Sequence, residues 1–215
     1  RSVMAHGVIE SIDTSEAQTM PGVAAVYTAA DLELLPEPPG NPMLNQGMTR
    51  TWLATDRVRY VGEPYAVVLA EPCAQAVDAA EMIWAEIEPL DAVVTIPDAM
   101  AEDVLLFPDL GTNRSFQMPS RVEGDVTDGC EVVVELEFTN PRLSVAPIEP
   151  RATVAVWEND HLTVWACTQF PHRTRDGFVA AFGLASEQCR VITPDVGGGF
   201  GGKNANYVED FVVGA

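Results

Sequence analysis

The sequence predicts an α+β fold built from two units. The first half alternates short apolar strands with an alanine-rich helix, and the second half carries a β-hairpin followed by another helix. Five of the ten residues in 194–203 are glycine, and this run follows a short apolar strand. Glycine costs backbone entropy and offers no side chain to bury, so we expect this loop to approach a ligand closely.

Composition places the chain among globular proteins. It has 215 residues, of which 47% are hydrophobic and 20% charged, enough for one large or two small domains. A formal net charge of −20 argues against nucleic acid or an anionic membrane surface as the main partner. No apolar run is long enough to span a membrane. We expect a cytoplasmic location, no membrane partner, and a chain that is an incomplete piece of a longer polypeptide.

The first unit is expected to end near residue 98. Its helix is the clearest element, because Pro72 stands in the first turn and alanines recur at helical spacing as far as Ile83. Its strands are short apolar runs bounded by turn residues. The expected elements are strands at 8–12, 23–28, 65–70, 86–90 and 92–94, helices at 15–18 and 71–85, and a loop at 36–50.

An irregular linker is expected over 99–122, because proline and glycine recur there. The second unit, 123–215, begins with 131–138, where Val132, Val134, Leu136 and Phe138 alternate with acidic residues as in a half-buried strand. We expect Trp157 and Trp165 of the hairpin to be core residues. The other expected elements are hairpin strands at 151–157 and 161–168, a helix at 171–182 ended by Gly183, a strand at 188–193 and a helix opening near 204.

The glycine loop also matches two common nucleotide motifs. Gly197, Gly199 and Gly202 fit the dinucleotide pattern G-x-G-x-x-G, which any glycine run satisfies easily. Residues 197–203 fit the phosphate loop G-x-x-x-x-G-K, but Asn204 stands where that motif requires Ser or Thr. A nucleotide-binding module, and a glycine turn with no ligand in a non-catalytic scaffold, both stay open at this point.

Cysteine and histidine spacing does not favour a metal centre built from side chains. The four cysteines, Cys73, Cys130, Cys167 and Cys189, lack C-x-x-C spacing, and the three histidines are far apart. We expect no metal ligand in this chain and interpret the cysteines as buried small hydrophobic residues.

Several separate segments resemble one family, the molybdenum-cofactor-binding large subunit of the xanthine dehydrogenase, aldehyde oxidase and carbon monoxide dehydrogenase group. They occur in the family's order across nearly the whole chain, so the resemblance does not depend on one motif. It implies an α/β hammerhead domain followed by the start of a molybdopterin-binding domain. The segments are Arg1-Ser2, Ala5-His6, 21–23, 28–32, 61–64, 148–151, Thr168-Gln169, Pro171-His172 and 196–203.

The resemblance also implies roles for particular residues. Gln169 matches the glutamine that donates its amide to the oxo ligand of molybdenum, and is therefore our candidate catalytic residue. Gly198, Gly199, Phe200 and Gly201 match the backbone that approaches the pterin. Since the pterin sulfurs hold the metal, no protein ligand to it is required. The family's catalytic Glu would lie beyond Ala215, so we expect this chain alone to be inactive.

The activity implied is oxidative hydroxylation of a C–H carbon in an aldehyde or N-heterocycle, with water as the oxygen source. The implied cofactor is molybdopterin, in its cytosine dinucleotide form, with [2Fe-2S] clusters and FAD on partner subunits. These would be an iron–sulfur subunit and an FAD subunit. Xanthine-oxidising members carry Glu where this chain has Asn204, so the sequence does not favour a purine substrate.

Overall fold

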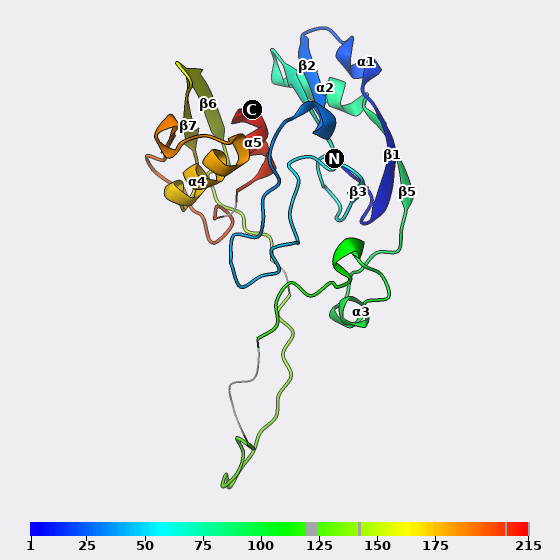
Figure 1. Ribbon diagram of the computed structural model, residues 1–215, viewed down its shortest axis with the longest axis vertical. Coiled ribbons are helices and arrows are strands. Elements are labelled where there is room, and N and C mark those ends of the chain that lie inside the picture. Colours follow the sequence, from blue (N-terminus) through cyan, green and yellow to red (C-terminus); the bar gives the residue numbers. More distant parts are fainter. Residues whose placement is uncertain (119–123, 142, 205, 215) are drawn as a thin grey trace.

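The two expected units lie side by side in the computed structural model, which describes residues 1–118, 124–141, 143–204 and 206–214 (Figure 1). Helices and strands are mixed in both units, as the α+β prediction requires. No helix among the described residues has the length and apolar character needed to cross a membrane.

The first unit contains two small antiparallel sheets. One has the order β3-β1-β5, from Arg57–Val58, Gly7–Asp13 and Trp84–Pro89. The other pairs β2 (Val23–Thr28) with β4 (Ala66–Ala70). Helices α1 (Ser15–Gln18) and α2 (Cys73–Glu81) pack close to β2 and β4 because small residues such as the fully buried Ala17 and Ala79 lie between them.

Helix α2 is shorter than predicted, and the strand after it starts earlier. The prediction extended the helix to Ala85, but Trp84 and Ala85 pair with Asp13 and Ile12 of β1. Ladder hydrogen bonds to β1 therefore replace the last helical turn. The strand predicted at 92–94 was also wrong, since no strand forms there.

The expected linker is partly ordered. Helix α3 (Ile96–Ala101) runs across its start, with the Thr95 hydroxyl accepting a hydrogen bond from the Asp98 N–H at 3.2 Å and proline in the first turn. A 3₁₀ turn, η2 (Pro108–Leu110), follows. The proline and glycine that suggested irregular chain here begin or end short helices instead. Residues 119–122 of the linker lie outside the described residues.

The strand predicted at 131–138 is absent. A turn at 125–130 forms the tip of a long arm that leaves both units (green in Figure 1). Residues 131–141 return from this tip as extended chain, without strand pairing to any described residue. Apolar and acidic residues do alternate over 131–138, but the apolar side chains are not buried: Val134 is 74% exposed and Phe138 is 83% exposed. A period of two indicates a strand only where a partner strand is available.

The second unit is built on a three-stranded sheet in the order β6-β7-β8. The predicted hairpin is confirmed as β6 (Thr153–Glu158) and β7 (His161–Ala166), and β8 (Cys189–Ile192) runs parallel to β7. Helix α4 (Pro171–Phe182) packs on β8 and ends at Gly183, whose φ of +65° suits glycine. The 3₁₀ turn η3 (Ser186–Gln188) precedes β8, and α5 (Val208–Gly214) closes the unit.

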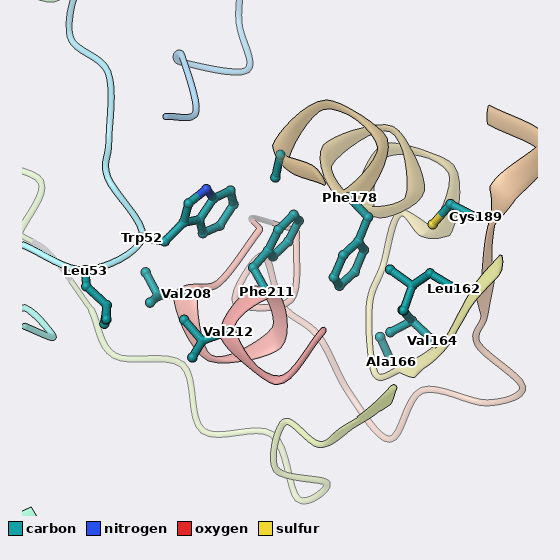
Figure 2. Packing of buried hydrophobic residues seen from close by; sticks show 11 residues of the cluster. Trp52, Leu53, Leu162, Val164, Ala166, Phe178, Cys189, Val208, Phe211 and Val212 are labelled. Atoms are coloured by element: carbon teal, nitrogen blue, oxygen red, sulfur yellow. The ribbon is translucent and has the colours of Figure 1, made fainter. Parts of the chain in front are cut away.

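Aromatic stacking joins the two units. Trp52 of the first unit stacks on Phe211 of α5 with centroids 4.0 Å apart, and Phe211 stacks on Phe178 of α4 at 4.1 Å (Figure 2). Phe178 and Phe211 are completely buried. Trp157 and Trp165, predicted as core, are 44% and 41% exposed. Trp165 pairs with the exposed Val154 on the outward face of the hairpin, whereas Trp157 pairs with the buried Leu162 and meets the Phe182 ring edge-on. Of the cysteines expected to be buried, only Cys189 is buried, while Cys73 and Cys130 are exposed and Cys167 is half-buried.

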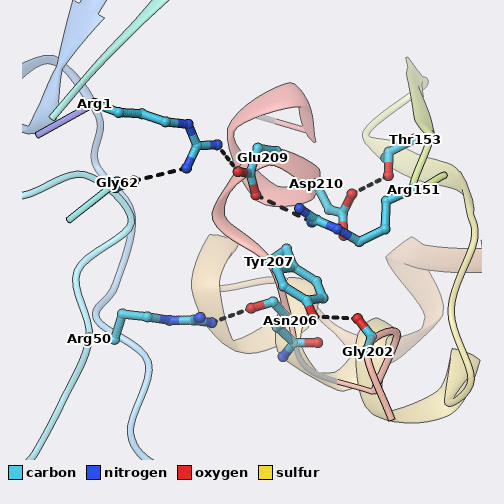
Figure 3. Close-up of polar contacts among 10 residues, drawn as sticks. All are labelled: Arg1, Arg50, Gly62, Arg151, Thr153, Gly202, Asn206, Tyr207, Glu209 and Asp210. Carbon is cyan, nitrogen blue, oxygen red and sulfur yellow. Dashed lines mark hydrogen bonds and ion pairs between the residues drawn. The ribbon is translucent and has the colours of Figure 1, made fainter. Parts of the chain in front are cut away.

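Polar contacts hold the segment around the start of α5, and those made by Arg1 and Arg50 cross the boundary between the units. Arg1 and Arg151 both form ion pairs with Glu209 of α5, and Arg50 donates to the Asn206 carbonyl (Figure 3). Each contact ties a residue near the start of α5 to another part of the chain. The glycine loop, which leads directly into this segment, is therefore fixed at its far end.

Candidate cofactor-binding site

The glycine loop, residues 194–203, connects β8 to the segment before α5. Three of its residues adopt positive φ: Gly198 (+96°), Phe200 (+49°) and Gly201 (+84°). A left-handed backbone at Phe200 is unusual for a residue with a side chain. That side chain is 76% exposed, so apolar packing within the described chain does not account for its conformation.

Gln169, at the end of the segment after β7, lies against the loop. Its Oε1 accepts hydrogen bonds from the backbone N–H groups of Gly201 (3.1 Å) and Lys203 (3.2 Å), and its own N–H donates to the Lys203 carbonyl (2.8 Å). Two N–H donors fix which side of the amide is oxygen. The Nε2 group is consequently turned away from them, and it has no hydrogen-bond partner among the residues described.

The middle of the loop presents backbone donors. The N–H groups of Gly198, Gly199 and Phe200 have no hydrogen-bond partner within the described parts of the chain, while the Gly201 N–H is already donated to Gln169. A Cβ at Gly199 would lie 2.5 Å from the Gln169 side-chain carbon Cδ, so only glycine brings the backbone this close. Successive free N–H groups at a left-handed turn are suited to an anionic group.

Glu149 holds the loop from the other side. Its Oε2 accepts hydrogen bonds from the Gly197 N–H (2.6 Å), the Lys203 ammonium (2.8 Å) and the Cys167 thiol (2.8 Å). Its own N–H donates to the Gly197 carbonyl (3.2 Å). The hydrogen bond from Cys167, with those from Lys203 and Gly197, lowers the pKa of Glu149 to about 2. The carboxylate is therefore ionised at any physiological pH.

Lys203 is enclosed by this arrangement. Its side chain is only 1% exposed. Burial lowers the pKa of its ammonium, but hydrogen bonds with Cys167 and Glu149 outweigh burial and the net shift is upward. The ammonium is thus charged, buried and paired. A phosphate-loop lysine must reach a nucleotide, and this one points into the protein.

A cavity of about 690 Å³ opens beside the loop. Its walls include Phe200, Gly201 and the Tyr207 ring, over which the Arg151 guanidinium lies at 3.6 Å from the centroid. The Tyr207 hydroxyl donates to the Gly202 carbonyl (Figure 3). A larger hollow of about 1010 Å³ lies between the first unit, around Arg59, and linker residues such as Phe107, and none of the glycine-loop residues line it.

The structure therefore brings together all the residues that the sequence pointed to: Gln169, Gly198, Gly199, Phe200 and Gly201. Sequence reasoning missed the cluster of Glu149, Cys167 and Lys203. A signal for Glu149 exists in the sequence, because 148–151 is one of the segments that carry the family resemblance. No group of three or more His, Cys, Asp or Glu side chains that could hold a metal ion occurs in the described portion of the chain.

The fold and this loop define a molybdopterin-binding class of protein. Residues 107–215 match the family model of the molybdopterin cofactor-binding domain, and residues 1–91 match that of the aldehyde oxidase and xanthine dehydrogenase a/b hammerhead domain. The chain belongs to this family, as its resemblance predicted.

Individual proteins of the family are similar to this chain over nearly its whole length. The chain is 34% identical to the nicotine 6-hydroxylase large subunit of Paenarthrobacter nicotinovorans, over 99% of this chain and 27% of that protein. It is 36% identical to the carbon monoxide dehydrogenase large chain of Afipia carboxidovorans, over 96% of this chain and 28% of that protein. Quinoline 2-oxidoreductase from Pseudomonas putida 86 superimposes with a TM-score of 0.86 at 32% identity, over 100% of this chain and 28% of that one. The chain thus spans little more than a quarter of these relatives.

Proposed function

We propose that this chain is part of the large subunit of a molybdenum hydroxylase, which hydroxylates a C–H carbon of an aldehyde or N-heterocycle with oxygen from water. The observation that carries this proposal is the set of unpartnered donors on the glycine loop and on the glutamine that lies against it. The N–H groups of Gly198, Gly199 and Phe200 and the Nε2 of Gln169 lack partners among the described residues. Such donors fit an electron-rich, anionic ligand.

These residues fit molybdopterin in particular. When bound, the cofactor supplies a molybdenum centre that accepts two electrons from the substrate. The glycine backbone of 198–201 allows the pterin to come close, and Gln169 offers a neutral N–H donor to the metal face without adding charge.

The finer assignments belong to the same proposal. Relatives named as a large subunit and a large chain support partner subunits, which we assign as an iron–sulfur subunit and an FAD subunit that receive the electrons. We propose the cytosine dinucleotide form of the cofactor and a cytoplasmic location. An N-heterocyclic substrate is supported by relatives named for nicotine and quinoline.

The nucleotide-binding alternative gains no support from the site. A phosphate loop needs a lysine whose ammonium can reach the phosphates of a bound nucleotide. The Lys203 ammonium is instead paired with Glu149 at 2.8 Å, and its side chain is almost fully buried. Binding of NAD or ATP is not expected.

The test is to purify the protein from its host with the subunits that accompany it, and to measure molybdenum, iron and flavin per large subunit. We expect about one molybdenum per large subunit, because one loop of this kind seats one pterin. Molybdenum absent from protein produced with ample molybdate, together with saturable ATP or NAD binding, would overturn the proposal in favour of the nucleotide module. Absence of all these ligands would favour a scaffold.

A further inference from the structure

The Glu149 carboxylate links three segments that are far apart in the sequence. It lies just before β6, and it reaches Cys167 after β7 and both Gly197 and Lys203 of the glycine loop. One oxygen, Oε2, accepts all three hydrogen bonds. Gly197 and Lys203, the first and last residues of the segment 197–203, therefore both donate a hydrogen bond to the same atom.

The loop is fastened at its ends and left free at its centre. At the first end, Gly197 exchanges two hydrogen bonds with Glu149. At the second end, the Lys203 backbone is bound to Gln169 and its ammonium to Glu149. Between them, the N–H groups of 198–200 have no partner within the residues the structure describes. Glycine-rich backbone would otherwise sample many conformations, and ordering it at the moment of binding would cost affinity.

The charge balance depends on both partners. The Lys203 side chain is 1% exposed and that of Glu149 is 39% exposed, so removing Glu149 leaves a buried cation without its counter-charge. Removing Lys203 leaves the carboxylate with only neutral donors. Loss of one member of a buried pair is much more costly than replacement of both. The pair therefore predicts a characteristic pattern of single and double substitutions.

We propose that Glu149 and Lys203 form a clasp that pre-organises the loop, so that the amides of Gly198, Gly199 and Phe200 are already aimed at the cofactor before it binds. Both are positioning residues, and neither contacts the cofactor. This inference rests on the proposed function, because it assigns the loop's ligand as molybdopterin.

The clasp is tested by cofactor content, which can be read without any turnover. Glu149→Gln, Lys203→Met and the double variant would be purified with accompanying subunits, and molybdenum and pterin per chain measured. We expect each single variant to lose about tenfold in cofactor occupancy, because the surviving partner is left without its counter-charge. The double variant keeps an acceptor for the Gly197 N–H and has no unpaired charge, so we expect it to recover most of the occupancy.

Two controls separate positioning from general destabilisation. Asp176→Asn breaks the exposed ion pair between Arg175 and Asp176 on α4 and should leave occupancy unchanged. Val164→Ala removes volume from the fully buried core of β7, and it shows how much occupancy falls when stability alone is lost.

The outcomes are distinct. The single variants are compared with Val164→Ala at an equal loss of melting temperature, and the clasp is overturned if they lose no more cofactor than that control. It is also overturned if the double variant holds less cofactor than either single variant. If Lys203→Met does not fold, Lys203→Arg, which keeps the charge, should retain more cofactor than Glu149→Gln, and equal losses would count against the clasp. Absence of molybdenum from the unmodified protein would contradict the proposed function itself, before the clasp is considered.

Discussion

Gln169 is oriented by its surroundings, and this decides what it can do. Because its Oε1 is occupied by the N–H groups of Gly201 and Lys203, its Nε2 is the group left to act on a ligand. Gln169→Ala should lower kcat/KM of the complete enzyme about 100-fold, the usual cost of one pre-organised donor.

The matched control for that change is Gln188→Ala, which removes another glutamine that bonds only to backbone groups, at Ala185 and Asp160, away from the loop. We expect this variant to be as active as the unmodified enzyme. A Gln169→Ala enzyme within twofold of normal activity would contradict the assigned role.

Glu149 makes folding stability depend on pH in the acid range. Its pKa is about 2 when folded, against an ordinary value of 4.5, because Cys167, Lys203 and Gly197 all donate to it. Its contribution is therefore full above about pH 4.5 and is lost as pH falls through about 2. The difference in unfolding free energy between the unmodified protein and Glu149→Gln, measured by urea denaturation, should shrink over that interval. A difference that stays constant would show that the carboxylate charge contributes nothing.

At the scale of elements, the glycine loop demands glycine for different reasons at different positions. Gly199→Ala would place a methyl group against the Gln169 side chain, 2.5 Å from its Cδ. Gly183, which ends α4 at a φ of +65°, has open space around the same position. We expect Gly199→Ala to lower molybdenum per chain severalfold by displacing Gln169.

The Gly183→Ala control suffers strain alone, and it should cost about 1 kcal/mol of stability with molybdenum content unchanged. Equal molybdenum content in the two variants would mean that the loop tolerates a side chain where the structure shows contact.

Elements were predictable from the sequence wherever local pattern and tertiary pairing agree. The hairpin and α4 were predicted because alternation, turn residues and Gly183 all act locally. The prediction extended helix α2 too far because Trp84 pairs with Asp13 of β1 and cannot then be helical. The local sequence pattern around Trp84 does not indicate that distant partner. For the site, motif similarity found Gln169 and the loop. The contact of Glu149 with Cys167 and Lys203 joins residues up to 54 positions apart, which spacing alone does not reveal.

At the scale of the whole molecule, one aromatic stack spans the boundary between the units. Phe211 lies between Trp52 and Phe178 and is completely buried. Phe211→Ala should destabilise the protein by about 3–5 kcal/mol, since it leaves a cavity and separates two stacked partners. Chemical denaturation would measure this loss.

Phe116→Ala provides the matched control, because that ring is 41% exposed, and we expect a much smaller effect. Equal losses in the two variants would mean that the burial and stacking of Phe211 contribute no more than a partly exposed ring does.

The extended arm carries a risk of its own. Its residues 131–138 offer unpaired backbone groups and alternating apolar side chains, with Val132 80% exposed and Phe138 83% exposed. Such an edge is a template for intermolecular β-sheet, and aggregation can begin from it whenever nothing covers it. For the chain as it stands here, we expect concentration-dependent self-association in sedimentation experiments, reduced by Val134→Lys. Covering this arm would protect the molecule from aggregation while leaving the cofactor loop untouched.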